Sequence, residues 1–357
     1  MHVSAEQVQL CLSMIAYAGS HGDPSRSSAA LHRTIASYLE RLLPEAGLEL
    51  TWGPASVRPW WQSSAPAVVG FVVAPQDGGV GPHHLVLRGG GLLTLSAELV
   101  EGLGCLEQAP WLWLQGDDDD LAPAICAGLS RCLDAVHRLT PDEGLPGGGR
   151  SLAEHLREAI AATPDSRRFV LDVVGHGVGG SLASVVALWL RDTQGRRSAR
   201  EESWDPQRQA KLRCTAFASP TPGNADFAGY LEERLEGELA LVSNTLDPAS
   251  MLWDAQAMLG LPGLYQPHVD ESPGVRLFVD ALANEIERQG IDYEQVPTSI
   301  LEGELCTTLP PSFAAQAEYQ HVHAYVEQLG LGGRLDRALL GELLGRSAST
   351  DDGPLAQ

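Results

Sequence analysis

The chain carries little positive charge. Its 357 residues include 24 Lys and Arg against 46 Asp and Glu, which gives a formal net charge of −22. Such an excess of negative charge repels nucleic-acid backbones and anionic lipid surfaces. The one basic cluster, residues 191–200, is followed at once by Glu201 and Glu202, so we interpret it as a solvated loop. We therefore expect no nucleic-acid partner.

Paired cysteines, long apolar runs and a basic leader are also missing. The six cysteines are Cys11, Cys105, Cys126, Cys132, Cys214 and Cys306. No C-x-x-C pair or neighbouring histidine pattern accompanies them, so we expect buried free thiols, no metal and no cofactor. No apolar run reaches the ~18 residues that span a bilayer, which predicts no stable membrane insertion. The apolar stretch LCLSMIAYAG follows a segment without Lys or Arg, unlike a secretory signal peptide, and we expect a cytoplasmic protein.

Strand and helix patterns alternate along the chain. Apolar residues at helical spacing predict helices over residues 5–18, 27–43, 93–103, 121–139, 151–162 and 225–235. Apolar or β-branched runs predict strands over residues 67–74, 83–88 and 111–114, and in RRFVLDVV, LRCTAFAS and LALVSN. Fully apolar strands between helices predict an α/β protein with a mostly parallel central sheet and helices on both faces. We expect one domain over residues 1–345, a lid or cap over 261–310, and a disordered acidic tail over 346–357.

The stretch FVLDVVGHGVGGSLASVVALWL runs from an apolar strand through a glycine-rich turn into an apolar helix. Gly175, Gly177 and Gly180 spell G-x-G-x-x-G, a pattern that lets a pyrophosphate approach the start of a helix. A dinucleotide-binding fold also needs a second strand that ends in an acidic residue about 20 residues later. A polar stretch stands there instead, so dinucleotide binding is the weaker interpretation.

The same stretch can be interpreted as a G-x-S-x-G nucleophile elbow in which Gly177 replaces the serine. α/β-Hydrolases place their catalytic residues in the order nucleophile, acid, base, each on a loop after a strand. Asp247 follows the strand LALVSN, and His321 comes 74 residues after it. The order required by a hydrolase is therefore present, although the attacking oxygen is missing.

Six segments in this order resemble the class 3 lipase family, the fungal-type triacylglycerol lipases and their bacterial relatives. GHGVGGSLA is similar to the family's GHSLGGALA, with Gly177 at the serine position. The other five are AYA, LVLRGG, FASPTPGNADFAGYL, NTLDPASMLW and YQHVHAYVEQLG. The resemblance covers most of the sequence and implies an α/β-hydrolase fold, a lipid or carboxylic ester as the small-molecule partner, and a bacterial member of the family.

The resemblance also implies roles for individual residues. Asp247 would orient His321, His321 would be the general base with His323 as the fallback, and the backbone N–H groups of Val178 and Gly90 would form the oxyanion hole. Two positions depart from the family. Gly90 lacks the hydroxyl that members usually carry after RG, and Gly177 has no side chain to attack a carbonyl.

Ordinary turnover is therefore not expected. Loss of the serine in a triad enzyme costs about 10⁶ in kcat. Ser181 and Ser184 lie about one and two helical turns past Gly177, so we expect their hydroxyls to meet packing neighbours rather than substrate. His176 is expected to pack below the elbow. The chain is accordingly interpreted as an inactive or engineered serine lipase or esterase; the alternative is a pseudo-enzyme that binds acyl groups or acts as a scaffold.

Overall fold

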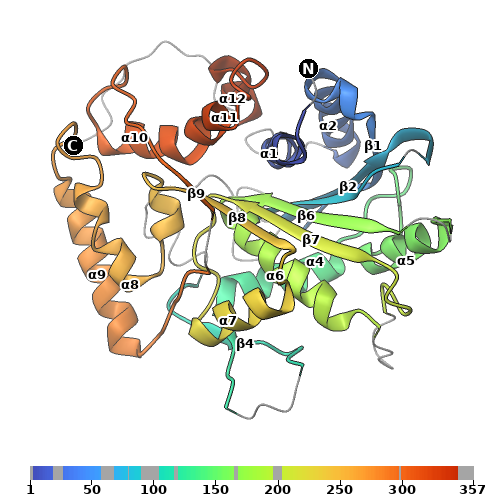
Figure 1. Ribbon diagram of the computed structural model, residues 1–357, viewed down its shortest axis with the longest axis horizontal. Helices are drawn as coiled ribbons and strands as arrows, with labels where there is room; N and C mark the ends of the chain where they lie inside the picture. The colour runs from blue at the N-terminus through green and yellow to red at the C-terminus, as the bar shows by residue number, and fades with distance from the viewer. Residues whose placement is uncertain are drawn as a thin grey trace.

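The computed structural model describes residues 3–18, 27–57, 68–78, 80–89, 104–115, 120–164, 168–195, 203–296 and 299–344. Within these ranges a seven-stranded sheet runs through the centre of the molecule, in the order β1-β2-β3-β6-β7-β8-β9 (Figure 1). Its strands are β1 (Leu48–Val57), β2 (Val68–Pro75), β3 (His83–Gly89), β6 (Val170–His176), β7 (Lys211–Phe217), β8 (Leu239–Asn244) and β9 (Ser299–Leu301). The pairings of β1 with β2 and β2 with β3 are antiparallel, and the other four are parallel. The expectation of a mostly parallel sheet is confirmed.

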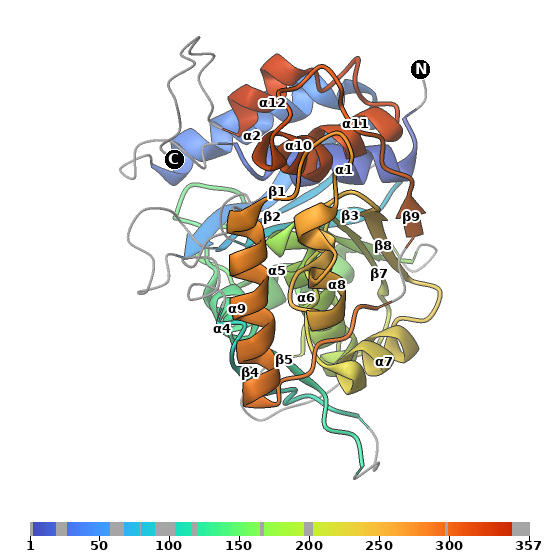
Figure 2. The same cartoon turned by 90° about the vertical axis from the view of Figure 1, so that its left-hand side faces the viewer.

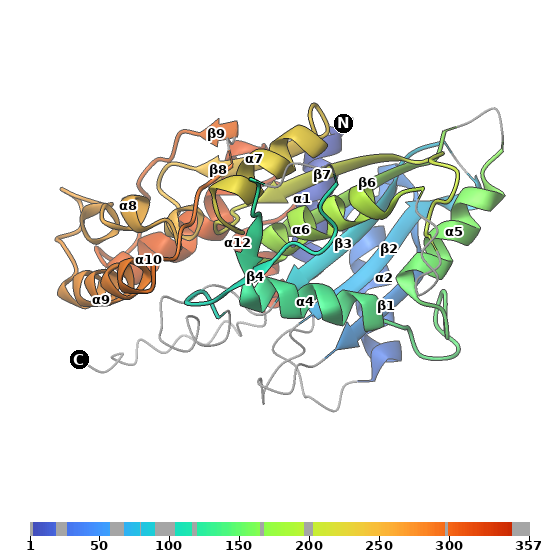
Figure 3. The same ribbon diagram turned by 90° about the horizontal axis from the view of Figure 1, so that it is seen from below.

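Helices cover both faces of this sheet, as expected. One face carries α1 (Ala5–Ile15), α2 (Ser28–Leu42), α11 (Ala324–Gln328) and α12 (Arg337–Leu343). The other carries α4 (Ala127–Arg138), α5 (Leu152–Ala162), α6 (Val178–Thr193) and α7 (Ala225–Arg234), which Figure 3 shows from below. Among them α6 packs against β3, β6 and β7, the strands that lead toward the elbow.

The strand sequences are apolar throughout because each strand contributes to two cores. In β2, Val72 packs into the core under α4 and α6, and Val73 packs into the core under α1 and α2. In β6, Val173 likewise packs into the first of these cores and Val174 into the second. Successive side chains of a strand point to opposite faces, so a sheet covered on both sides needs an apolar residue at nearly every position.

Smaller elements complete the described chain. They are β4 (Gln108–Pro110), β5 (Ala124–Cys126), α8 (Ala255–Met258), α9 (Pro273–Gln289), α10 (Phe313–Glu318) and the short turns η1 (Pro44–Ala46), η2 (Gln76–Gly78), η3 (Pro248–Met251), η4 (Leu261–Gly263) and η5 (Tyr319–His323). Figure 2 shows α9 facing the viewer, and its buried residues join the core that also contains α6. The range 261–310 thus contains α9 and also β9, which extends the central sheet; its role as a lid stays a prediction.

Two expectations about local structure are wrong, and one strand was missed. Residues 111–114 form a turn, and the strand lies just before them as β4, which pairs with β5. The helix predicted from residue 121 begins only at Ala127, because β5 occupies the three preceding residues. Strand β1 was not predicted, since Gly53 and Pro54 interrupt its pattern, and its register with β2 shifts at this point.

Other expectations lie partly or wholly outside the described residues. The helix at 93–103, the tail at 346–357 and Gly90 are among them. Within the described part all six cysteines are free thiols; five are buried and Cys306 is partly exposed. None of the described helices combines the length and the apolar character needed to cross a membrane, and no group of three described His, Cys, Asp or Glu side chains is arranged to hold a metal ion.

Candidate active site

Gly177 forms a sharp turn between strand and helix. Strand β6 ends at His176, α6 begins at Val178, and Gly177 between them has φ 59° and ψ −131°. Its N–H donates to the carbonyl of Phe217 at the end of β7, at 2.9 Å. A positive φ with this ψ is sparsely populated by residues with side chains and is the strained geometry of a nucleophile elbow. Glycine adopts it without a steric penalty.

The neighbouring glycines allow the strand and the helix to pack closely. A Cβ atom on Gly175 would overlap the carbonyl oxygen of Gly179, and one on Gly179 would lie 2.6 Å from the carbonyl oxygen of Leu87. These contacts account for the glycine spacing without any nucleotide. Strand β7, which follows α6, ends at Phe217 rather than at an acidic residue, so the ribose partner of a dinucleotide fold is not at that strand end.

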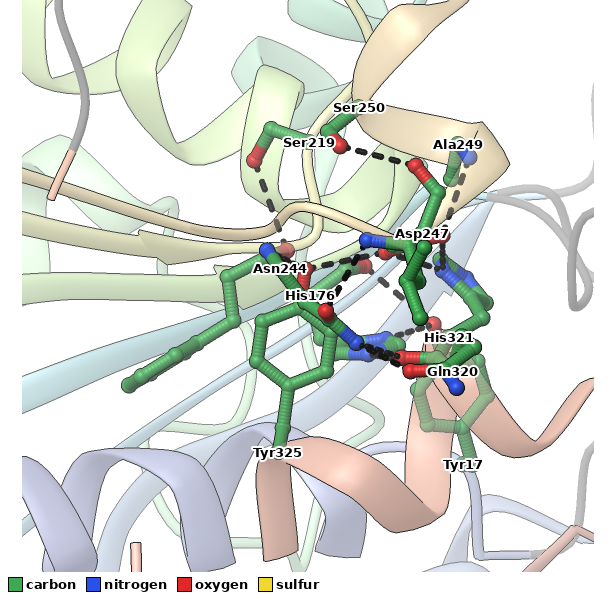
Figure 4. A network of polar contacts seen from close by, with 12 residues as sticks. Tyr17, His176, Ser219, Asn244, Asp247, Ala249, Ser250, Gln320, His321 and Tyr325 are labelled. Carbon is green, nitrogen blue, oxygen red and sulfur yellow. Dashed lines mark hydrogen bonds and ion pairs between the residues drawn. The ribbon is translucent and has the colours of Figure 1, made fainter. Parts of the chain in front are cut away.

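His321 and Asp247 meet beside the elbow, although 74 residues separate them in the chain. The Nδ1 atom of His321 lies 3.1 Å from Oδ2 and 3.2 Å from Oδ1 of the Asp247 carboxylate (Figure 4). Asp247 follows β8 and has no exposed surface, and His321 lies in the π-helical turn η5. An Nδ1–H that donates to the carboxylate leaves the lone pair on Nε2, which is the tautomer required of a general base.

Two further groups hold the Asp247 carboxylate. The N–H of Ala249 donates to Oδ1 and the hydroxyl of Tyr325 donates to Oδ2, each at 2.9 Å. Burial, together with the nearby Asp247 charge, raises the pKa of Tyr325 well above its usual value, so the phenol stays protonated. The same hydroxyl accepts the N–H of Asn244 at 2.9 Å. Sequence reasoning missed Tyr325, and the only available signal was its position four residues after His321.

The free nitrogen of His321 faces Gly177. A Cβ atom built on Gly177 would lie 3.2 Å from His321 Nε2 and 3.5 Å from the hydroxyl oxygen of Tyr17. Nε2 is buried and has no hydrogen-bond partner. Buried polar atoms are normally paired, and an exception calls for an explanation. The position next to Nε2 is where a hydroxyl on residue 177 would stand.

His176 supports the turn from below, as expected. Its Nε2 contacts the carbonyl of His321 at 2.8 Å, and its Nδ1 contacts the Tyr17 hydroxyl at 3.1 Å. Burial lowers the pKa of His176 well below its usual value, and the neighbouring His321 ring lowers it further, so the ring of His176 is neutral. Nε2–H therefore donates to the carbonyl and Nδ1 accepts from Tyr17. These bonds join the turn that follows α1, the end of β6 and the His321 segment.

The oxyanion donors are only partly within the described chain. Val178 is the first residue of α6, so its N–H has no acceptor within that helix and can point at a ligand. Gly89, the last described residue of β3, lies against it: a Cβ on Gly89 would be 3.1 Å from the Val178 side chain. Gly90 follows and lies outside the described residues.

The remaining candidates point elsewhere. Ser181 donates to the Pro220 carbonyl at 2.7 Å, and Ser184 donates back to Gly180 in its own helix at 3.2 Å. Both hydroxyls thus meet neighbouring backbone carbonyls, as expected. The ring of His323 stacks on Tyr319 with the centroids 6.1 Å apart, and no described contact joins it to Asp247.

Comparisons with known proteins bear on the fold. The sequence model of the class 3 lipase family matches residues 134–254, which include the elbow and Asp247. The crystal structure of M37 lipase superposes with a TM-score of 0.81 at 24% identity, covering 96% of this chain and 100% of that chain. The fold is a lipase-type α/β-hydrolase fold.

More distant likenesses are weaker. The Lip2 lipase of Yarrowia lipolytica gives a TM-score of 0.45 at 14% identity, over 70% of this chain and 75% of that chain. Lipase II of Rhizopus niveus gives 0.42 at 14% identity, over 71% and 78%. None of the curated proteins is detectably similar in sequence.

Proposed function

We propose that this chain is a class 3 lipase-type protein for lipid or carboxylic esters that has kept its acid and base but lost its nucleophile. The observation that carries the proposal is the buried, unpartnered Nε2 of His321, aimed at Gly177 and backed by Asp247. A serine hydroxyl at that point would lose its proton to Nε2 as it attacked a carbonyl, and the Asp247 carboxylate would stabilise the imidazolium. The Val178 N–H and a second donor from Gly90 would bind the oxyanion.

The unaltered chain does not form an acyl-enzyme in this scheme. Position 177 offers only hydrogen atoms, and Ser181 and Ser184 are engaged elsewhere. Removing the nucleophile of a triad costs about 10⁶ in kcat and leaves about 10³ to 10⁴ over water from the oxyanion hole and binding. We therefore propose a pseudo-enzyme that binds acyl groups without ordinary lipase turnover.

The test restores the oxygen. Gly177→Ser should raise the hydrolysis of p-nitrophenyl esters by orders of magnitude over the unaltered protein. The added Cβ stands 3.2 Å from His321 Nε2, so the buried ring must shift by a few tenths of an ångström to accept it. Burst kinetics should then report an acyl-enzyme.

Two controls separate the hydroxyl from the added carbon. Gly177→Ala brings the same Cβ and the same backbone strain but no oxygen, and should stay at background. Gly177→Ser combined with His321→Ala should also stay near background, because the base is gone. A Gly177→Ser protein that folds and binds an acyl analogue yet remains inert would contradict the proposal.

A further inference from the structure

Four arginines line a pocket at the end of the sheet where the parallel strands begin. Gly177 lies at the opposite end of the strands. The pocket has a volume of about 380 Å³ and is lined by Gln115, Arg168, Arg191, Asp192, Gln194, Arg208, Ala210 and Arg234. Parallel strands begin at one edge of a sheet and their helices run back to it. Arg168 and Arg208 stand just before β6 and β7, and Arg191 and Arg234 lie in the last turns of α6 and α7. Residues far apart in the chain thus meet there.

Only one of these arginines has a carboxylate partner in the described chain. Arg234 pairs with Asp192, Nε to Oδ1 at 2.8 Å. The Asp192 carboxylate also accepts from Trp111 and Tyr230, at 2.9 and 3.0 Å, so three donors share it. With four arginines and one aspartate, the lining has a formal charge of +3. A positive pocket of this kind is unexpected in a chain whose net charge is −22.

Arg191 lies among like charges. Its Nε is buried and has no hydrogen-bond partner. Burial lowers the pKa of Arg191, the charge of Arg234 lowers it further, Glu238 and Asp192 raise it, and Arg168 lowers it again. Glu238 is itself paired with Lys211 at 2.8 Å. A guanidinium that is partly desolvated and repelled by its neighbours is stabilised by an added anion.

Arg208 is held in an unfavourable backbone conformation. Its φ is +56°, a value that residues with side chains rarely adopt. A Cβ atom on Gly195 would overlap the Arg208 side chain, so the glycine leaves room for that side chain to cross. Strained residues of this kind cluster at functional sites. The favourable position of a cation at a helix C-terminus accounts for Arg191 and Arg234, but Arg168 and Arg208 are not on helices.

We propose that this pocket binds a phosphate-bearing ligand, and that it does so independently of the site at Gly177. Guanidinium groups bind phosphate through two parallel N–H···O bonds, and several of them match a multiply charged oxyanion better than a single carboxylate. The volume of the pocket exceeds that of one phosphate and suits a diphosphate group or a phosphate monoester. The source is either a soluble phosphate compound or a lipid headgroup.

Isothermal titration with inorganic diphosphate tests the soluble source, and cosedimentation with phosphatidylcholine vesicles containing phosphatidate tests the headgroup. We expect saturable one-to-one diphosphate binding that weakens as salt rises. Arg191→Gln and Arg208→Gly should each raise Kd by about tenfold or more. Arg208→Gly also relieves the backbone strain, so it should raise Tm while it weakens binding, a combination that a merely structural arginine would not give.

The matched control is Arg288→Gln. Arg288 also lies in the last turn of a helix, but it is exposed and paired with Glu285. Its loss should leave Kd unchanged. Binding to phosphatidate vesicles alone, lost in Arg191→Gln, would assign the pocket to a headgroup and still support it. No binding in either arm, or equal weakening by Arg288→Gln, would overturn the proposal. If Arg191→Gln does not fold, Arg191→Lys keeps the charge and should still weaken binding.

Discussion

Two buried carboxylate–imidazole pairs lie in the central sheet and its loops, and they differ in what else each carboxylate binds. In one pair, His84 on β3 lies opposite Asp172 on β6, with Nδ1 3.5 Å from Oδ2. Arg213 on β7 lies opposite Asp172 on the other side and donates two hydrogen bonds to its carboxylate, from Nε to Oδ1 at 2.5 Å and from Nη2 to Oδ2 at 2.8 Å. In the other pair, Asp247 and His321 have no described arginine or lysine within ion-pair distance.

The difference shows that the third group decides what such a pair can do. The Arg213 guanidinium compensates the negative charge of Asp172. Burial lowers the pKa of His84 to about 4, so the His84 imidazole stays neutral and has a structural role. Asp247 instead receives hydrogen bonds from Ala249 and Tyr325, which orient it without cancelling its charge. Its imidazole keeps a carboxylate that can stabilise an imidazolium.

The largest expected effect concerns catalysis in the Gly177→Ser protein. Asp247→Asn should lower its kcat by about 10⁴, because the amide no longer holds the reactive tautomer of His321. Asp172→Asn should leave kcat within a few-fold. The measurement is p-nitrophenyl ester hydrolysis under saturating substrate. Equal losses in the two variants would show that the pairs do not differ in the way proposed.

The next effect is on stability. Asp172→Ala leaves buried His84 and partly buried Arg213 without their partner, and should lower the free energy of unfolding by about 3 kcal/mol. Arg213 is 37% exposed, which keeps the loss at the lower end of the range for buried pairs. Urea unfolding measures it. Asp172→Leu combined with Arg213→Met should recover much of the loss; if it is no better than Asp172→Ala, the unpaired charge is not the cause.

A smaller effect is the response to pH. Folded His84 resists protonation down to about pH 4, whereas an unfolded histidine takes up a proton below about pH 6.5. The unfolded state therefore binds more protons in this window, and stability falls as pH drops from 6.5 to 4. Between pH 7.5 and pH 5 the loss due to His84 should be about 2 kcal/mol.

The variant His84→Gln removes this titration. Urea unfolding at the two pH values should show a smaller loss for His84→Gln than for the unaltered protein. Burial also lowers the pKa of His155 to about 4, so part of the acid loss should remain in the variant. Parallel pH dependences in the two proteins would rule out His84 as a source.

The smallest expected effect comes from removing one hydrogen bond from each of the two carboxylates. Tyr325→Phe removes a bond to Asp247, and Gln9→Leu removes a bond of 3.2 Å to Asp172. Each should cost about 1 kcal/mol of stability. In the Gly177→Ser background only Tyr325→Phe should also lower kcat. A lowered kcat in Gln9→Leu would mean that the two regions are coupled.

Much of the fold was predictable because it rests on local patterns. Apolar runs and helical spacing predicted β2, β3, α5 and α7 to within a residue or two. The failures have local causes as well: Gly53 and Pro54 hid β1, and the apolar WLWL motif looked like a strand although it turns. Tyr325 carried no motif, since its importance comes only from its contact with Asp247.

Charge was the least predictable property. Residues 191–200 were interpreted as a solvated loop, yet Arg191 lines a pocket with Arg168, Arg208 and Arg234. Net charge is a sum over the chain and says nothing of where side chains of one sign converge. The parallel sheet brings the starts of β6 and β7 and the ends of α6 and α7 together at one end of the strands. The linear sequence does not indicate that these four arginines are neighbours.

By itself, the sequence determined the alternation of apolar strands and helices and the absence of an attacking oxygen at position 177, because both are properties of single residues and short spacings. Only the tertiary structure decided that the unpaired nitrogen of His321 faces Gly177 and that four arginines share a pocket. Both depend on where distant segments meet, and that is set by sheet order and helix packing rather than by any local pattern.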